Sequence, residues 1–278
     1  MTPLFILPFD HRVSFARDVL GATYPVTKSE KAQLIAYKQV IFDGFLSARE
    51  QYKGDAALGV LLDEEFGTPV LTKAKKMGIP FAVTTESPVH EPFGFIHKDF
   101  GKALKKWLPT WAKALVYYTV GNEKMNAATR KKLRTLSAFC EKEHIDFMLE
   151  VLVKGDGIQR TLMERMIDEI HEDGIAPTLW KIEGLDHPED WTTLAAHAKA
   201  PIIVLGRGES AEHVDGWLTA AAKSGHTIGF AVGRTIFLQP IQDLHNGAID
   251  RESAVAQIAK NYLHCIKVWE KAYGDNHM

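Results

Sequence analysis

The chain has 278 residues, of which 46% are hydrophobic and 24% charged, the composition of an ordinary water-soluble globular protein. Its formal net charge of −2, with acidic and basic residues interspersed, offers no electrostatic footprint for nucleic acid or for an anionic membrane surface. The expected partner is therefore a small molecule. Two cysteines, Cys140 and Cys265, favour a reducing cytoplasm over a disulfide scaffold or a zinc cluster.

The opening run MTPLFILPFD lacks the basic start and the small-residue cleavage site of a signal peptide, so it is interpreted as a first strand. From there, short apolar runs alternate with longer amphipathic stretches, and no apolar run reaches the length that spans a bilayer. Strands are expected at residues 5–10, 58–63, 80–86, 113–118, 146–153, 178–183, 201–206 and 227–232. Helices are expected at residues 28–52, 68–77, 98–107, 126–142, 159–172, 188–198, 211–223 and 251–273.

Strand-then-helix units that repeat in this way predict an α/β protein, a single (β/α)₈ TIM barrel over residues 1–278. The alternative is an open doubly wound sheet, but no Gly-x-Gly-x-x-Gly turn follows the first strand. In a barrel, active-site residues collect at the carboxyl ends of the strands. The polar residues at those ends are Asp10, Asp63, Glu64, Glu86, Tyr117, Tyr118, Glu150, Lys181, Glu183, Arg207 and Arg234. Asp63 and Glu64 are better explained as caps of the following helix.

The segment Trp180-Lys181-Ile182-Glu183-Gly184 places two charges on what is predicted to be a buried strand. Because successive side chains of a strand point to opposite faces, Lys181 and Glu183 face the barrel interior while Trp180 and Ile182 pack under the helices. A desolvated lysine near other charges is a candidate nucleophile toward a carbonyl carbon. A buried ion pair without chemistry explains this motif equally well.

The same parity argument applies to the two preceding strands. An apolar outward face on residues 146–153 turns Glu150 inward, and Lys113 is predicted to face inward on residues 113–118. Three adjacent strands then present Lys113, Glu150 and Lys181 to one cavity, which brings a second cation and a proton-exchanging carboxylate close to the nucleophile. Lys113 is alternatively a structural counter-ion of Glu150, and the two roles are compatible.

The last two strands end in the glycine–arginine sequences Gly206-Arg207-Gly208 and Gly233-Arg234. Loops at these positions of a barrel often bind phosphate, because glycine lets backbone N–H groups approach the anion and arginine pairs with it. The alternative is an arginine that caps a helix or forms a surface ion pair.

Six motifs, PFDHR, LLDEEFG, FMLEVLV, WKIEGLD, VLGRG and GFAVGRTIF, together resemble the aldolase-like domain fused to 5-dehydro-2-deoxygluconokinase in bacterial inositol catabolism. More distantly, the chain is similar to tagatose-1,6-bisphosphate aldolase and the sulfofructose-phosphate aldolases. The resemblance covers nearly the whole chain. It departs from the family at Val13, where a glycine is expected, and at Thr85-Glu86-Ser87-Pro88, where a Glu-Lys-Ser-like segment is expected. These departures leave the choice of substrate open.

The resemblance implies a class I aldolase with Lys181 as the Schiff-base nucleophile, Glu150 and Lys113 as a proton-transfer or pKa-setting pair, and Asp10 as a group that holds substrate hydroxyls. It implies phosphate binding by the two glycine–arginine loops, and Arg12 and Glu183 join the expected substrate-binding residues. No cofactor and no metal are then required. The resemblance also suggests a substrate, 2-deoxy-5-keto-gluconate 6-phosphate, with dihydroxyacetone phosphate and malonate semialdehyde as products.

Two other functions remain open from the sequence. A metal-dependent aldolase or isomerase on the same barrel would need metal ligands, and only His11 and His90 lie near strand ends among the histidines. A non-catalytic sugar-phosphate-binding protein would keep the fold without the chemistry. The expected partner is a phosphorylated sugar, with no nucleic acid and no membrane, and a homo-oligomer is compatible with the sequence.

Overall fold

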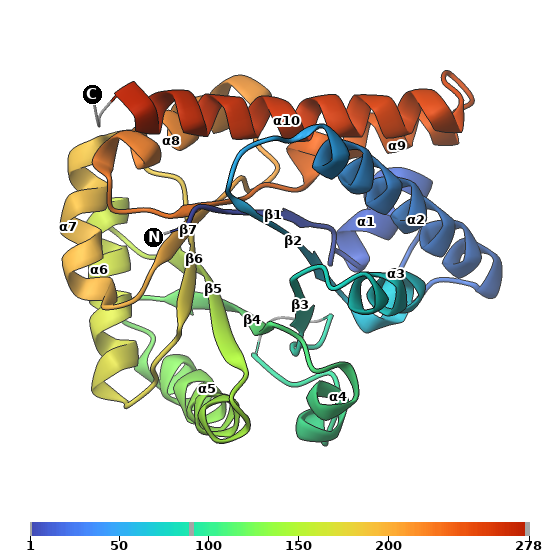
Figure 1. Ribbon diagram of the computed structural model, residues 1–278. Coiled ribbons are helices and arrows are strands. Elements are labelled where there is room, and N and C mark those ends of the chain that lie inside the picture. The colour runs from blue at the N-terminus through green and yellow to red at the C-terminus, as the bar shows by residue number, and fades with distance from the viewer. Residues whose placement is uncertain (1, 89–91, 276–278) are drawn as a thin grey trace.

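The computed structural model describes residues 2–88 and 92–275, and within them eight parallel strands close into a barrel in the order β1 to β8. The predicted (β/α)₈ barrel is confirmed, with a helix or helix pair after each strand in the described residues (Figure 1). The strands are β1 (Leu4–Pro8), β2 (Ala57–Leu62), β3 (Phe81–Thr84), β4 (Trp111–Thr119), β5 (Asp146–Lys154), β6 (Leu179–Glu183), β7 (Ile202–Leu205) and β8 (Gly229–Ala231).

The helices surround the barrel and bury its outer face. They are α1 (Val13–Leu20), α2 (Lys28–Gln51), α3 (Glu64–Lys76), α4 (Phe100–Trp107), α5 (Glu123–Glu143), α6 (Gln159–Glu172), α7 (Pro188–Ala198), α8 (Ala211–Ser224), α9 (Arg234–His245) and α10 (Arg251–Asp275). The long final helix α10 packs against α2, α8 and α9 and thereby covers the junction between the first and last parts of the chain (Figure 1).

Side-chain caps explain where some helices begin earlier than the sequence pattern indicated. Asp63 accepts a hydrogen bond from the Phe66 backbone N–H at 2.7 Å, so α3 begins at Glu64 rather than at residue 68. Asn122 caps α5 in the same way, so α5 begins at Glu123, three residues before the predicted start at residue 126. The short helices α1 and α9 were not predicted, and both begin directly after segments that carry site residues.

Alternation along the strands produces two apolar layers. Outward residues such as Trp180 and Leu149 join a large core under the helices. Inward residues fill the barrel interior with a smaller cluster formed by Leu4, Ile6, Leu61, Ala82, Met148, Leu179, Ile203 and Ala231. Because this cluster packs the interior, the charged inward residues further along the same strands lie above a solid apolar floor rather than in an open pore.

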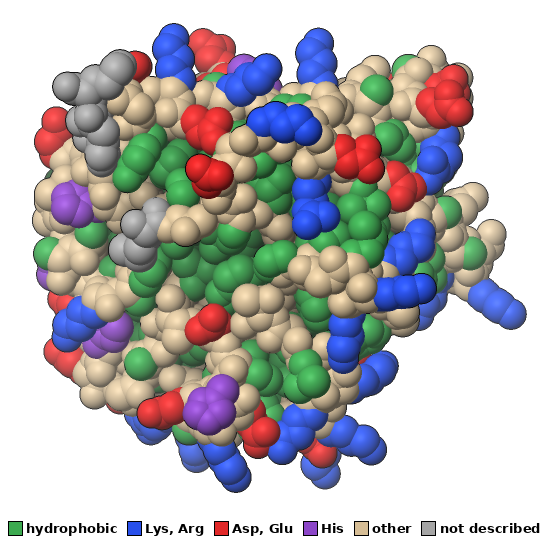
Figure 2. Space-filling model, in the orientation of Figure 1, with side chains coloured by type: hydrophobic (Ala, Val, Ile, Leu, Met, Phe, Trp, Pro, Cys, Tyr) green, Lys and Arg blue, Asp and Glu red, His purple; other side chains and the backbone are tan. Residues whose placement is uncertain are grey.

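Figure 2 shows acidic and basic side chains around the edge of one face, with apolar side chains at its centre. Among the described residues, no helix combines the length and the apolar character needed to cross a membrane.

Candidate active site

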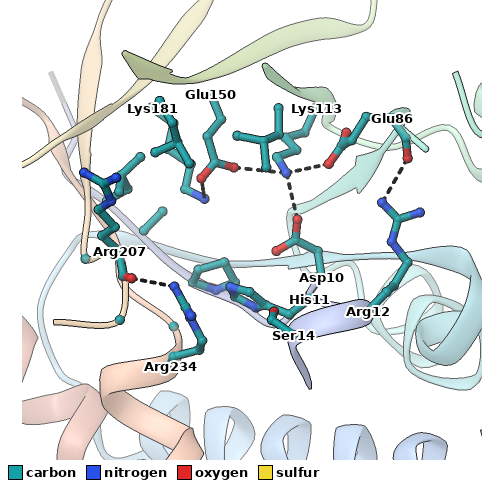
Figure 3. Close-up of a pocket in the computed structure, with 18 of the residues that line it drawn as sticks. Asp10, His11, Arg12, Ser14, Glu86, Lys113, Glu150, Lys181, Arg207 and Arg234 are labelled. Carbon is teal, nitrogen blue, oxygen red and sulfur yellow. Dashed lines mark hydrogen bonds and ion pairs between the residues drawn. The ribbon is translucent and has the colours of Figure 1, made fainter. Parts of the chain in front are cut away.

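A cavity of about 400 Å³ opens at the carboxyl ends of the strands (Figure 3). Its walls combine charged side chains from β4, β5 and β6 with the segments that follow β1, β3, β7 and β8. Of the residues expected from the sequence, the cavity is lined by Asp10, Arg12, Lys113, Glu150, Lys181, Gly206, Arg207, Gly208, Gly233 and Arg234. Glu183 is the one predicted site residue absent from this lining, and it lies behind Arg207.

Lys181 and Glu150 lie side by side in the wall of the cavity. They are register partners on β5 and β6, and Lys181 Nζ lies 2.7 Å from Glu150 Oε1. Both side chains are buried, with relative exposures of 4% and 8%. The parity argument therefore holds for β5 and β6, since both residues point to the same side of their strands as predicted.

Lys113 occupies the centre of three carboxylates. Its Nζ lies 2.8 Å from Asp10 Oδ2, 2.7 Å from Glu86 Oε1 and 3.0 Å from Glu150 Oε2. Glu150 thus bridges the two lysines, one through each oxygen (Figure 3). A buried ammonium with three carboxylate partners is fully paired, so this arrangement fixes the geometry of the whole group.

Charge pairing shifts the pKa values of these groups away from their ordinary ranges. Burial by itself lowers the pKa of Lys113, but the charges of Asp10, Glu150 and Glu86 outweigh burial and hold that pKa well above its usual value. Burial likewise raises the pKa of Asp10 and of Glu150, while Lys113 and Lys181 outweigh it and hold both pKa values below the usual range. Lys113 is consequently an ammonium, and Asp10 and Glu150 are carboxylates.

Glu86 is a member of this cluster that the sequence did not single out. It was among the polar strand-end residues, but a strand end alone did not separate it from helix-capping acids such as Asp63. It is 2% exposed, and its backbone carbonyl accepts a hydrogen bond from Arg12 Nη2 at 2.9 Å. An antiparallel bridge to Phe95 holds its backbone in place. Arg12 therefore connects the turn after β1 with the segment after β3.

The loops after β7 and β8 meet at the cavity, and together they are called the glycine–arginine cradle. Arg207 and Gly208 both have positive φ, 52° and 82°, which turns the loop sharply beside the cavity. A Cβ atom on Gly233 would lie 2.3 Å from the Pro8 carbonyl oxygen, so only glycine permits this approach. Gly233 is the N-cap of α9 and supplies no side-chain cap, which leaves the first N–H groups of α9 available to an anion.

The two arginines of this cradle are held differently. The Arg234 guanidinium donates to the Arg207 carbonyl oxygen and passes over Gly208. The Arg207 side chain instead forms an ion pair with Glu183. Glu183 also accepts a hydrogen bond from the Val153 backbone N–H at 3.1 Å. Burial raises the pKa of Glu183, against the opposing effects of that hydrogen bond and of Arg207. In this structure, Glu183 orients Arg207 rather than facing the cavity.

His11 lines the cavity between the predicted residues Asp10 and Arg12. Burial lowers the pKa of its imidazole to about 3, in spite of the neighbouring Asp10 carboxylate. The other histidine considered as a metal ligand, His90, lies outside the described residues. Across residues 2–88 and 92–275, no group of three or more His, Cys, Asp and Glu side chains has the arrangement of a metal site.

The fold of this chain superposes on several solved protein structures. A protein from Corynebacterium glutamicum, Cgl0159, superposes with a TM-score of 0.62 at 14% identity, over 94% of this chain and 85% of that one. An archaeal fructose-1,6-bisphosphate aldolase, whose catalytic lysine is bound to the carbinolamine intermediate, gives 0.58 at 14% identity over 94% of both chains. A Schiff-base-forming fructose-1,6-bisphosphate aldolase gives 0.57 at 14% identity over 93% of both. At these identities the likeness establishes the fold alone.

The family is established by sequence. The chain belongs to DUF2090, a family described as an uncharacterized protein conserved in bacteria, whose model matches residues 1–273. Among curated proteins, none matches the chain.

Proposed function

We propose that the protein is a class I aldolase that cleaves or forms a phosphorylated keto-sugar through a Schiff base on Lys181. One observation supports the proposal: a buried lysine that contacts a carboxylate at 2.7 Å shares a single cavity with the glycine–arginine cradle, which we propose binds the phosphate. A ketone whose phosphate is held by the cradle would have its carbonyl carbon directed to Lys181. The names of the superposed archaeal and Schiff-base aldolases agree with this chemistry.

The reaction begins when the uncharged amine of Lys181 attacks the carbonyl carbon of the substrate, which forms a C–N bond and a carbinolamine. Glu150 is the carboxylate in contact with Nζ, so it is the group that takes up and returns the amine proton. Loss of the carbinolamine hydroxyl as water leaves a protonated imine.

Carbon–carbon cleavage follows from the charge on the imine. A base removes the proton of the β-hydroxyl, the hydroxyl carbon becomes an aldehyde, and the electron pair of the broken C–C bond moves toward the imine nitrogen to form an enamine. Glu150, Tyr117 and an ordered water are the candidate bases, and Tyr117 also lines the cavity. Protonation of the enamine and hydrolysis of the imine then release the ketone and restore Lys181.

Lys113 has a different role in this mechanism. Its three carboxylate contacts keep it charged, so it is not the nucleophile. Through Glu150 it holds the proton acceptor in place, and through Asp10 it orients the carboxylate proposed to hold substrate hydroxyls. The sequence left open whether Lys113 serves the chemistry or is a structural counter-ion of Glu150. In this mechanism it does both, because as the counter-ion of Glu150 it also positions that carboxylate.

For the substrate, the proposal is a phosphorylated ketose, with 2-deoxy-5-keto-gluconate 6-phosphate placed first because of the family resemblance. That substrate would give dihydroxyacetone phosphate and malonate semialdehyde. Assays that compare it with fructose 1,6-bisphosphate and tagatose 1,6-bisphosphate decide between these candidates.

The test of the reaction class is borohydride trapping. With dihydroxyacetone phosphate present, borohydride is expected to add mass to the peptide that contains Lys181. The Lys181→Met variant is expected to lose this adduct and to cleave several orders of magnitude more slowly. A Lys223→Met variant, which removes a lysine outside the active-site cavity, serves as the control. Trapping at Lys113 would refute the assignment of Lys181. Cleavage that a chelator abolishes would instead indicate a metal-dependent enzyme, and phosphate binding without any adduct would indicate a non-catalytic sugar-phosphate-binding protein.

A further inference from the structure

His11 is a cavity-lining residue that the proposed mechanism does not use. It is adjacent to Asp10 in the chain, and Figure 3 shows it between Asp10 and Arg234. The charges that act on its imidazole come from Asp10, Arg234, Lys181 and Glu150, all of which line the same cavity. A substrate that spans Lys181 and the glycine–arginine cradle would share this cavity with the ring.

The imidazole has no hydrogen-bond partner among the described residues. Its Nδ1 atom is buried and unpaired, which costs free energy in a folded protein unless a bound group completes the hydrogen bonding. Burial also keeps the ring uncharged near neutral pH. A neutral imidazole has one N–H donor and one nitrogen acceptor, and this combination matches a hydroxyl group rather than an anion.

The surroundings hold the ring in place without using its nitrogen atoms. Phe237 of α9 contacts the imidazole edge to face, with ring centroids 6.1 Å apart. The His11 backbone carbonyl accepts a hydrogen bond from Lys38 Nζ at 3.1 Å, and Lys38 forms a fully buried ion pair with Asp63. The polar side of the ring is thus preorganised while its hydrogen-bonding capacity is unused.

A purely structural explanation would make His11 a packing residue of the β1–α1 turn. Such a residue is usually apolar or has its nitrogen atoms bonded within the protein. His11 meets neither condition, and it faces a cavity whose other walls carry groups for a carbonyl and a phosphate.

We propose that His11 is a specificity residue that hydrogen-bonds the substrate hydroxyl on the carbon next to the carbonyl carbon, and so selects hydroxy-ketone phosphates over their deoxy analogues. This inference rests on the proposed function. The hydroxyl next to the carbonyl carbon is chosen because His11 lines the same cavity as Lys181, which would bind that carbon, and because the charge of Lys181 acts on the imidazole. The phosphate is left to Arg234 and the N–H groups of the cradle.

The experiment uses two probes that differ in this hydroxyl alone, dihydroxyacetone phosphate and hydroxyacetone phosphate. The probe concentration that gives half-maximal borohydride trapping at Lys181 is measured for the wild type, His11→Leu and His11→Asn. Leucine is close to histidine in volume and has no hydrogen-bonding atom, whereas asparagine retains a donor and an acceptor. The wild type is expected to reach half-maximal trapping at a roughly tenfold lower concentration of dihydroxyacetone phosphate, which corresponds to the free energy of one neutral hydrogen bond.

In His11→Leu this preference is expected to fall to about one, with part of it restored in His11→Asn and with competition by inorganic phosphate unchanged. Structural damage would weaken both probes together and leave their ratio intact. A wild type without preference, or a leucine variant that keeps the wild-type ratio, overturns the inference. If the wild type forms no adduct, the proposed function fails instead, and calorimetric binding of the same two probes to the wild type and His11→Leu then decides the role of His11 by the same ratio.

Discussion

Replacement of Lys113 by methionine tests whether this residue organises the site. The change removes the ammonium that contacts Asp10, Glu86 and Glu150 at 2.7–3.0 Å, whereas the remaining lysine, Lys181, forms its ion pair with Glu150. Removal of one partner from a buried ion pair costs about 3–5 kcal/mol of unfolding free energy, because the other charge stays buried. Since three carboxylates lose their common partner here, the loss at pH 7 is expected at the upper end of that range.

The pH dependence of this loss follows from the depressed pKa values of Asp10 and Glu150. A carboxylate whose pKa is lower in the folded than in the unfolded state stabilises the fold above its unfolded pKa, and this contribution disappears as the pH falls through the folded pKa. Without Lys113, Asp10 loses the ammonium that depresses its pKa and Glu150 keeps only Lys181, so buried carboxyls take up protons more readily. The difference between wild type and variant is therefore expected to be largest near pH 7 and smaller near pH 4.

Urea unfolding followed by the fluorescence of the six tryptophans measures this difference at both pH values. Lys105→Met is the matched control, because Lys105 forms an exposed ion pair with Glu143 and should change the unfolding free energy by less than about 1 kcal/mol. A loss below 1 kcal/mol for Lys113→Met, or an equal loss at pH 7 and pH 4, would refute the view that this ammonium neutralises the three carboxylates.

Three further outcomes are expected. Lys181→Met should keep the wild-type fold by circular dichroism, since Glu150 retains Lys113 at 3.0 Å, while cleavage falls by several orders of magnitude; a variant that still cleaves contradicts the mechanism. Arg234→Ala should weaken phosphorylated ligands by about 1.5–3 kcal/mol in calorimetry and leave unphosphorylated analogues nearly unchanged, and an equal loss for both would assign Arg234 to packing or helix capping. The pKa of His11 is about 3 in the folded protein, below its usual value, so below pH 6.5 the unfolded state takes up a proton that the folded state does not. The unfolding free energy should therefore fall by up to about 1.4 kcal/mol for each pH unit below 6.5. His11→Asn should flatten this slope in pH-dependent urea titrations, and an unchanged slope would contradict a buried neutral ring.

Much of the geometry of the candidate site was predictable from local sequence because strand parity is a local property. The apolar residues Trp180 and Ile182 had to pack outward, so Lys181 had to face the interior, and the same reasoning placed Glu150. The alternation of strands and helices likewise predicted the barrel, and a barrel brings all strand ends to one rim.

What sequence patterns could not determine was which charged side chains contact one another, because those contacts join residues far apart in the chain. Glu86 and Lys113 are 27 positions apart, and Asp10 and Lys113 are 103 apart. Parity brought Lys113 to the cavity but gave no sign that three carboxylates would surround it and hold it charged. The same limit applies to Glu183. It does not line the cavity, because it pairs with Arg207, and that pairing depends on how the loop after β7 folds back. Local alternation in the sequence by itself thus determined the barrel and the inward direction of Lys113 and Lys181. Only the closure of the barrel decided which charged groups pair and left His11 Nδ1 without a hydrogen-bond partner in the described part of the chain, because these contacts depend on residues that are distant in the chain.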